Sequence, residues 1–511
     1  MTLEEFSAVL LVSSLVLLAA VLAVRLSART GLPSLLLYLG LGLLLGEDGL
    51  GVQFSDAGLT QLLGYGALVL ILAEGGLTTR WSAVRDVLAP AAVLATVGTA
   101  VSTVVVGAGA HLLLELPWPT ALLVGAVVSS TDAAAVFSVL RSVPLPRRLT
   151  GLLEAESGLN DAPVVIAVLA LTEVAAGHAA HAWWVLVAEA VLELGVGTLV
   201  GVGGGWAGAV LLRRTALPSS GLYPLAVLSL AVGAYAAADL LHGSGFLATY
   251  LCALVLGNAR LPHRHATRGA AESAGWLAQI GLFVVLGLLA VPSRLPGAVG
   301  EALLVGLVLT VLGRPLSVLA SLLPFRRGPR RTGPAELVFL SWAGLRGAVP
   351  VVLATVPVVA GVPGAARLFD VVLVLVVVFT LVQARTLLPL ARALRLVPTA
   401  TTSELDVEVS PLGTLSADVV RVRVGEGSRL HGVEVFELRL PAGANVTLVA
   451  RDGATFVPGA RTALRRGDEV LVVTGTAERA AVEERLQQVS RHGKLAGWRG
   501  AGPSGPHRGH A

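Results

Sequence analysis

Charged residues are scarce in this chain of 511 residues: Asp, Glu, Lys and Arg together make up 14%, whereas soluble globular proteins carry about 25%. The mean hydropathy is correspondingly high, at +0.80. A water-soluble protein with so few charges could not cover its own surface with polar groups. The scarcity therefore argues against an ordinary soluble protein and predicts that most of the chain lies in a lipid bilayer.

Cysteine and lysine are nearly absent. Cys252 is the only cysteine, which excludes an intrachain disulfide and a metal site built from cysteines. Lys494 is the only lysine, so the formal net charge of +4 comes from arginines in short clusters between apolar runs. Such clusters are typical of membrane-protein loops, and we expect no nucleic acid among the partners. No basic segment precedes the first apolar run, which predicts a retained first helix and not a signal peptide.

Long apolar runs are abundant. A helix needs about 20 apolar residues to cross the hydrocarbon core, and thirteen candidate spans follow, the second and ninth of them short. They are 5–25, 31–46, 57–77, 88–114, 119–140, 155–176, 183–212, 222–241, 244–258, 271–291, 297–323, 335–359 and 368–395. The predicted fold class is an all-α polytopic membrane protein with about 13 transmembrane helices, followed by a small α+β cytosolic domain.

Arginines gather in every second loop between these spans, while only Arg294 and Arg367 lie in the intervening loops. Cytoplasmic loops carry an excess of basic residues. The pattern predicts that the N-terminus lies outside and the C-terminal domain in the cytoplasm, and we expect the membrane to be a bacterial inner membrane. The sixteen arginines on the predicted cytoplasmic side are Arg25, Arg29, Arg80, Arg85, Arg141, Arg147, Arg148, Arg213, Arg214, Arg260, Arg264, Arg268, Arg326, Arg327, Arg330 and Arg331.

The composition changes near residue 398, where charged residues return. We expect a transmembrane domain over 1–397, a linker over 398–403, a compact domain over 404–490 and a disordered tail over 491–511, which is rich in Gly, Pro, His and Arg near its end. Within the compact domain the predicted strands and helix are Asp418–Val424, Asn445–Arg451, Glu469–Thr474 and Glu478–Ser490.

Four polar residues in a row, Ser129, Ser130, Thr131 and Asp132, interrupt the fifth span. Hydroxyl groups compete for backbone hydrogen bonds, so this cluster predicts a helix broken near the middle of the membrane. A break exposes carbonyl groups and half-helix dipoles to an ion. A simple kink packed by Ser and Thr is the alternative, but it leaves the carboxylate of Asp132 unexplained.

A second polar cluster, from Glu154 to Asp161, opens the predicted sixth span. Ser157 and Asp161 are four residues apart and share one helix face, while Glu156 and Asn160 share the adjacent face. Acidic residues are favoured at a helix N-terminus, which would explain Glu154 but not Asp161, two turns further in. Because an ionisable group inside a membrane is costly, Asp161 is a candidate functional residue.

The third cluster is Gly344-Leu-Arg346-Gly347-Ala-Val-Pro350 in the twelfth span. Glycines and a proline around an arginine predict a second broken helix. The buried charge of Arg346 needs a partner, and Glu156 is the natural candidate. If the seventh span links two six-helix halves, both breaks fall in the fifth helix of their half. Matching breaks are typical of transporters built from inverted repeats, with the site between the repeats.

Other polar residues within the spans carry weaker predictions. Glu74 lies near the end of the third span, where it could be interfacial. Five more could line a water-filled cavity or make contacts between helices: Glu189, Glu193, Asp239, Gln279 and Gln383.

Four motifs resemble the monovalent cation:proton antiporter-1 family of NhaP-type and NHE-type exchangers: SSTDAAAVFSVLR (129–141), ESGLNDAPVV (156–165), GSGFLATYLCALVLGN (243–258) and WAGLRGAVP (342–350). The resemblance covers residues 5–395. It implies a fold like those of NhaA and NapA, with two broken helices that cross, and it implies a homodimer. Asp161 would bind the cation or the proton and Asn160 would support it. Thr131, Asp132 and Ser157 would supply further oxygen atoms, and Glu156 would pair with Arg346.

The segment 404–490 resembles a TrkA-C (RCK C-terminal) domain in its LRRGDEVLVV run. This pairing is similar to that of the CvrA-type potassium/proton antiporters of the family. The resemblance implies regulation by a small ligand, such as a nucleotide or cyclic dinucleotide, and no other cofactor.

These features together favour a secondary active antiporter, not an enzyme, that exchanges K⁺ or Na⁺ for H⁺. K⁺ is favoured by the resemblance, and Na⁺ stays open because the same oxygen ligands serve both ions. Because the electroneutral members of the family that this chain resembles have Asn-Asp at this position, the resemblance implies one-for-one exchange through Asn160-Asp161. We expect alternating access of an elevator type. Two other classes were weighed. A ligand-gated cation channel would conduct without proton coupling. An intramembrane hydrolase with Asp132 and Asp161 as its carboxylate pair would leave Arg346 without a role.

Overall fold

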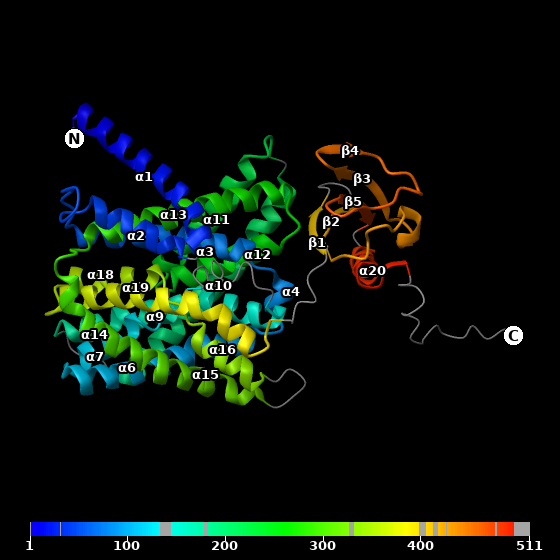
Figure 1. The fold of residues 1–511 in the computed structure, drawn as a ribbon. Coiled ribbons are helices and arrows are strands. Elements are labelled where there is room, and N and C mark those ends of the chain that lie inside the picture. Colours follow the sequence, from blue (N-terminus) through cyan, green and yellow to red (C-terminus); the bar gives the residue numbers. More distant parts are fainter. Residues whose placement is uncertain are drawn as a thin grey trace. The chain divides into compact units, whose positions relative to one another are not determined.

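The computed structural model describes residues 2–30, 32–132, 145–177, 182–215, 217–326, 332–397, 405–411, 417–425, 427–475 and 478–494. The chain divides into two compact units, Met1–Val397 and Pro398–Ala511. Figure 1 shows the first as a bundle of helices and the second as a small sheet with one helix.

The described helices of the first unit follow in chain order. They are α1 (Leu3–Thr30), α2 (Ser34–Leu45), α3 (Ala57–Thr78), α4 (Trp81–Val84), α5 (Leu88–Val93), the π-helix η1 (Leu94–Gly98), α6 (Thr99–Leu114), α7 (Trp118–Val127), α9 (Arg147–Ala175), α10 (Trp183–Arg214), α11 (Leu222–Leu240), α12 (Gly245–Asn258), α13 (Arg264–Leu289), α14 (Leu295–Val308), the π-helix η2 (Leu309–Gly313), α15 (Arg314–Leu322), the 3₁₀-helix η3 (Leu323–Arg326), α16 (Pro334–Trp342), α17 (Ala348–Leu353), α18 (Thr355–Val359) and α19 (Ala365–Ala393).

Among the described residues, nine helical stretches are long and apolar enough to cross a membrane, and four shorter apolar helices accompany them. Their outer faces are apolar as well. The span Val9–Ser27 of α1 is only 6% buried at a mean hydropathy of 2.6, and Trp184–Arg214 of α10 is 11% buried. Surfaces of this kind suit lipid and not water. That all thirteen helices cross the bilayer stays a prediction.

The helices form two groups (Figure 1). In one, α3 packs against α12 and α13, α2 against α13, and α10 and α11 against α12. In the other, α7 packs against α6 and α9, and α14 against α19. The groups meet where α9 contacts α12 and where α17 contacts α3.

The two π-helices have similar surroundings. The first, η1, precedes α6 and packs against α15, while η2 precedes α15 and packs against α6. Each π-helix therefore packs against the α-helix that directly follows the other π-helix. This arrangement fits the inverted repeat expected from the sequence, which stays a prediction.

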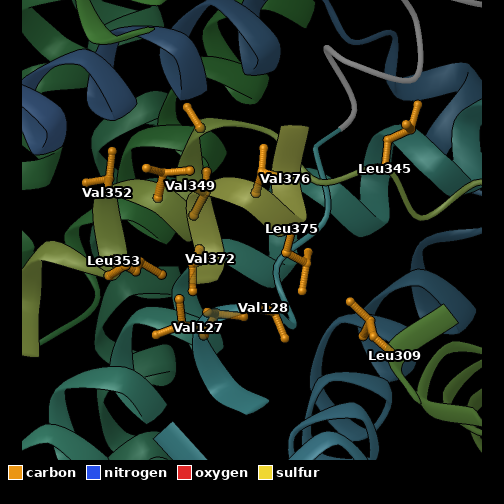
Figure 2. Packing of buried hydrophobic residues seen from close by; sticks show 14 of the residues in the cluster. Val127, Val128, Leu309, Leu345, Val349, Val352, Leu353, Val372, Leu375 and Val376 are labelled. Atoms are coloured by element: carbon orange, nitrogen blue, oxygen red, sulfur yellow. The ribbon is translucent and has the colours of Figure 1, made fainter. Parts of the chain in front are cut away.

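Both predicted helix breaks are present. The helix α7 ends at Val127, and Ser130–Asp132 have no regular structure; the remainder of the predicted fifth span, residues 133–140, lies outside the described residues. The predicted twelfth span is interrupted over residues 343–347, between α16 and α17. Buried apolar side chains enclose the breaks, among them Val128, Leu345 and Val349 (Figure 2). Because these side chains exclude water, the polar groups of both breaks need hydrogen-bond partners within the protein.

The predicted start of the sixth span at residue 155 is wrong. The helix α9 begins at Arg147, directly after Pro146, and continues through Pro163. Proline fixes φ near a helical value and lacks an N–H group, which suits the position before the first helical turn. Glu154 therefore lies two turns inside the helix and does not cap it.

The second unit holds an antiparallel sheet with the strand order β1-β2-β5-β3-β4. Its described elements are β1 (Leu405–Pro411), β2 (Ala417–Val424), the 3₁₀-helix η4 (Val435–Leu438), β3 (Asn445–Arg451), β4 (Ala454–Phe456), β5 (Glu469–Gly475) and α20 (Arg479–His492). The three predicted strands and the predicted helix are confirmed to within two residues. Buried valines of β2 and β5 alternate with more exposed residues, because one sheet face covers the core.

Candidate functional site

The two interrupted segments contact each other directly. The backbone N–H of Asp132 donates to the carbonyl oxygen of Leu345, 2.9 Å away. Glycines allow this approach: a β-carbon on Gly347 would overlap with the carboxylate of Asp132, and one on Gly344 would come within 2.7 Å of Nε of Arg314. Residues without a side chain therefore stand where the two backbones and the guanidinium of Arg314 come together.

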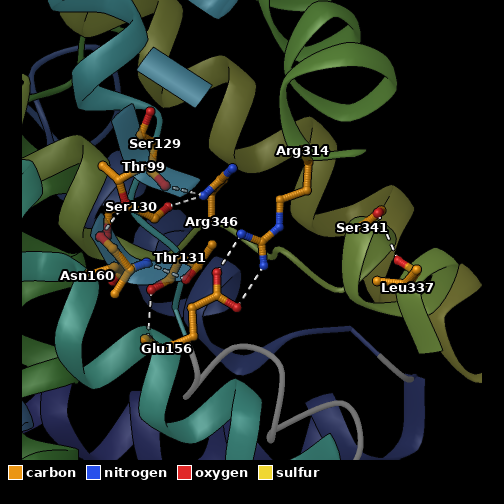
Figure 3. A network of polar contacts seen from close by, with 12 residues as sticks. Thr99, Ser129, Ser130, Thr131, Glu156, Asn160, Arg314, Leu337, Ser341 and Arg346 are labelled. Atoms are coloured by element: carbon orange, nitrogen blue, oxygen red, sulfur yellow. Dashed lines mark hydrogen bonds and ion pairs between the residues drawn. The ribbon is translucent and has the colours of Figure 1, made fainter. Parts of the chain in front are cut away.

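Three side-chain hydrogen bonds join α9 to the segment Ser129–Asp132 (Figure 3). The hydroxyl of Ser130 donates to Oδ1 of Asp161 (2.8 Å), and the hydroxyl of Ser157 donates to the carbonyl oxygen of Thr131 (2.7 Å). Asn160 donates from Nδ2 to the Thr131 hydroxyl (2.5 Å). The polar groups that the break frees are thus bound by the polar face of α9.

Arg346 stabilises the broken helix itself. Its Nη1 donates to the carbonyl oxygens of Ser129, at 2.8 Å, and of Ser130 (Figure 3). The backbone carbonyl of Arg346 accepts in turn from the hydroxyl of Thr380 on α19, at 2.8 Å. A helix that stops at Val127 leaves carbonyl groups without helical partners, and a fully buried guanidinium supplies the missing donors.

The predicted ion pair between Glu156 and Arg346 is wrong in its arginine. Glu156 accepts two hydrogen bonds from Arg314, from Nη1 at 2.5 Å and from Nη2 at 2.9 Å. Both side chains of this pair are at most 5% exposed. A planar guanidinium matches a carboxylate at two points, whereas Arg346 is already engaged by the backbone carbonyl groups.

Arg314 was missed by the sequence reasoning, although a signal was present. It is an arginine within the apolar span 297–323 and stands directly before Pro315. Buried charges of this kind need partners, so Arg314 was as good a candidate partner for Glu156 as Arg346. Ser130 was also not selected among the oxygen ligands, although its hydroxyl contacts Asp161.

A cavity of about 290 Å³ reaches this site, and four of the five predicted ion ligands line it: Thr131, Asp132, Ser157 and Asp161. Asn160 is not among its lining residues and instead holds the hydroxyl of Thr131. Asp161 is 7% exposed, so its carboxylate is nearly dehydrated yet reachable through the cavity.

The opposite wall of the cavity comes from the other helix group. Glu74 and Thr78 of α3, Tyr250 of α12, and Trp276 and Gln279 of α13 line it. Glu74 therefore lines the cavity, and its depth in the membrane stays a prediction. Gln279 lines the cavity as one of its two predicted alternatives, whereas Glu189, Glu193, Asp239 and Gln383 do not line it.

These groups are suited to a monovalent ion. Carboxylate, hydroxyl and carbonyl oxygens can replace part of the hydration shell of such an ion, and a carboxylate also accepts a proton. Among the described residues no three His, Cys, Asp or Glu side chains form a group that could hold a metal ion. Cation binding by the five ligands stays a prediction.

Two families match the chain. Residues 15–393 match the family described as sodium/hydrogen exchanger, transmembrane, and residues 419–487 match the TrkA-C domain. The chain is 38% identical over 480 residues to the K(+)/H(+) antiporter NhaP2 of Shewanella oneidensis, covering 92% of this chain and 82% of that protein. It is 37% identical over 483 residues to the K(+)/H(+) antiporter NhaP of Alkalimonas amylolytica, covering 93% and 82%.

The fold is similar to that of the sodium proton antiporter MjNhaP1 from Methanocaldococcus jannaschii at pH 8. The TM-score is 0.67 at 23% identity, over 76% of this chain and 99% of that chain. At this identity the likeness concerns the fold alone. The predicted fold class, a mostly helical membrane protein followed by a small domain with a sheet, is confirmed.

Proposed function

The chain belongs to the sodium/hydrogen exchanger family and carries a TrkA-C domain, and on that premise we propose that it exchanges a monovalent cation for protons across the inner membrane. Members of this family are transporters, so the protein is a transporter and not an enzyme, as the sequence predicted. The proposal concerns the ion, the stoichiometry and the mechanism.

One observation carries the proposal. Asp161 is buried, but it lines a cavity together with the oxygen-bearing side chains of Thr131, Asp132 and Ser157. Among the described residues no guanidinium is bonded to Asp161, whose carboxylate accepts from the Ser130 hydroxyl. A buried carboxylate of this kind is costly when it is ionised and holds no cation. Either a proton or a partly dehydrated cation relieves this cost. The two compete for the same oxygens, so loading one displaces the other.

The stoichiometry follows from the neighbour of Asp161. Asn160 is a neutral amide that binds the Thr131 hydroxyl, so the position next to Asp161 on α9 adds no second carboxylate to the pair. We therefore favour electroneutral exchange of one cation for one proton. The cavity has one wall from α3 and α13 and the other from α9 and the broken helices. An elevator motion between these groups would expose Asp161 to alternate sides.

K⁺ is the favoured cation, because the two relatives at 37–38% identity are K(+)/H(+) antiporters by name. Na⁺ is the alternative within the same class. The TrkA-C domain would regulate exchange through a small ligand such as a nucleotide or cyclic dinucleotide. We further propose a homodimer, with the N-terminus outside and the C-terminal domain in the cytoplasm.

Replacing Asp161 with Asn tests the site. Everted vesicles that contain Asp161→Asn should show no cation-dependent dissipation of a pH gradient, while the variant is still present in the membrane. Glu301→Gln is the matched control, because Glu301 pairs with Arg367 at a partly exposed position away from the cavity. If Asp161→Asn exchanges at the rate of the control, the site assignment is wrong.

A titration with K⁺, Na⁺, Li⁺ and Rb⁺ in the same vesicles identifies the cation. Dissipation by K⁺ at the lowest concentration supports the favoured ion, and dissipation by Na⁺ alone supports the alternative. A current carried by the purified protein without proton movement would instead support a ligand-gated channel.

A further inference from the structure

Three arginines meet where α3 is followed by α4. Asn258 at the end of α12 donates from Nδ2 to the carbonyl oxygen of Thr79 and accepts from the backbone N–H of Trp81, both at 2.9 Å. Arg80 lies between these two residues, so its backbone is fixed beside the end of α12. Arg264, the first residue of α13, donates from Nη2 to the carbonyl oxygen of Gly257 at 2.8 Å. Both arginines are thus held at the same helix end.

The helix register brings Arg268 to the same corner. On α13, Gly275 faces Glu74 of α3, since a β-carbon at Gly275 would lie 3.0 Å from Cγ of Glu74. Arg268 precedes Gly275 by seven residues on the same face, about 10 Å along the helix. Arg80 follows Glu74 by six residues and lies just past the end of α3 at Thr78, so it comes to a similar level. In agreement, Arg268 interacts electrostatically with both Arg80 and Arg264.

Two of the three nitrogens of the Arg268 guanidinium lack acceptors among the described residues. Its Nε and Nη2 are buried and have no hydrogen-bond partner in the described part of the chain. Among the described residues, Glu272 on the next turn of α13 is the carboxylate that interacts with Arg268 electrostatically, and its side chain is exposed. Buried donors without acceptors are unusual in proteins. An acceptor with several oxygens and a negative charge would satisfy them.

We propose that Arg80, Arg264 and Arg268 form a binding site for the phosphate group of an anionic phospholipid. Phosphate offers oxygens to several guanidinium groups at once. The corner lies at the ends of apolar helices that are long enough to cross a membrane. Trp81 is 44% exposed there, and indole rings favour the depth of lipid headgroups. A lipid headgroup is therefore favoured over a soluble phosphate.

Occupancy of this site acts on the cation path. Thr79 and Glu272, which flank the three arginines, also line the cavity that reaches Asp161. The opening also carries Glu74, Glu154 and Glu272, and Glu154 interacts electrostatically with Arg80. A bound phosphate would offset the charge of the three arginines and leave the opening more negative, which attracts a cation. An anionic lipid should therefore lower the apparent KM for the cation. Lipid binding itself does not depend on the proposed exchange.

Native mass spectrometry of the full-length protein tests the site. Protein exchanged into micelles with equal amounts of phosphatidylglycerol and phosphatidylcholine should retain phosphatidylglycerol preferentially. Arg268→Gln should bind it about tenfold more weakly, and Arg268→Lys should lose less because it keeps the charge. The matched control is Arg214→Gln, since Arg214 is exposed at the end of α10 on the same predicted side. Equal retention by Arg268→Gln and the control would overturn the proposal.

Exchange kinetics separate the two sources of phosphate. In liposomes, adding phosphatidylglycerol should lower the apparent KM of the wild type and of Arg214→Gln but have a smaller effect on Arg268→Gln. A general effect of membrane surface charge would change the KM of all three proteins equally, so it does not contribute to the difference between them. If millimolar inorganic phosphate in phosphatidylcholine liposomes lowers the KM through Arg268 while phosphatidylglycerol does not, the lipid assignment is wrong. A variant that elutes as an aggregate is replaced by Arg268→Lys.

Discussion

Each unit contains an ion pair between an arginine and a buried carboxylate, but the two arginines differ in their exposure to water. In the first unit, Arg314 and Glu156 have side chains that are 5% and 2% exposed, and Arg346 binds carbonyl groups deep in the bundle. In the second, Arg451 binds Asp468 at two points, but its side chain is 20% exposed while that of Asp468 is 0%.

The difference lies in what can replace a lost partner. Water reaches the guanidinium of Arg451, so removal of its partner leaves a hydrated charge. No water-exposed surface lies at Arg314, so removal of one member of its pair leaves the other charge buried and unpaired. Breaking a buried pair in this way costs about 3–5 kcal/mol. Loss of one partner should therefore cost more stability in the membrane unit than in the second unit.

The largest effect is expected for Arg314→Met, which leaves Glu156 without its partner. We expect a loss of about 3–5 kcal/mol of stability. The double variant Arg314→Met with Glu156→Leu should recover most of this loss, because neither charge of the pair is left without its partner. Thermal unfolding in detergent, followed by size-exclusion chromatography, measures both. Asp468→Asn is the control in the second unit, because it leaves the partly exposed Arg451 and no buried charge, and an equal loss there would refute the comparison.

Arg346→Gln should have a smaller effect on stability. An amide can still donate to one of the two carbonyl groups of Ser129 and Ser130, and the other is left unpaired at about 1–3 kcal/mol. Exchange should fall more than stability, because these carbonyl groups belong to the segment that holds Asp161. Vesicle assays and thermal unfolding of the same preparation measure the two effects. A variant that loses stability and keeps full exchange would show that Arg346 does not position the site.

Gly347→Ala tests the contact between the broken helices. Its β-carbon would overlap with the carboxylate of Asp132, and the forced shift should cost about 1–3 kcal/mol and weaken cation binding. Gly300→Ala on α14 is the control, because no atom lies within 4 Å of its β-carbon position. The apparent KM for the cation and the unfolding temperature of both variants are compared. Identical values for the two variants would mean that the close contact between Gly347 and Asp132 contributes neither to stability nor to cation binding.

The smallest effect is expected in the second unit. Burial alone would raise the pKa of Asp468, but hydrogen bonds from Arg451 and from the backbone N–H of Arg465 lower it below its ordinary value. A depressed folded-state pKa contributes stability above the unfolded value of about 3.9, and this stability is lost as the pH falls through the folded value.

Hydrogen exchange of β3 and β5 in the full-length protein, corrected for the intrinsic pH dependence, measures this contribution. Protection should decrease as the pH falls below about 4. Asp468→Asn should reduce protection by about 1 kcal/mol at neutral pH and remove the part of the pH dependence that Asp468 causes. Unchanged exchange in Asp468→Asn would assign no stabilising role to this carboxylate.

Local composition predicted much of the site. Four adjacent polar residues, Ser129 to Asp132, weaken the helix of the fifth span, because their side chains compete for backbone hydrogen bonds. Two glycines near Arg346 weaken the helix of the twelfth span. Both breaks could therefore be predicted. Ser157 and Asp161 share a face of α9 because they are four residues apart. The position of each group along its own segment follows from such short-range rules.

The amino-acid sequence by itself determined the apolar spans, the breaks, the buried carboxylate of Asp161 and the second domain. Only the tertiary structure decided which arginine pairs with Glu156. Arg314 and Glu156 are 158 residues apart, and either buried arginine could satisfy a carboxylate in principle. The tertiary structure also decided that Ser130 contacts Asp161, because an unwound segment has no fixed period and its side-chain directions depend on the partners that enclose it.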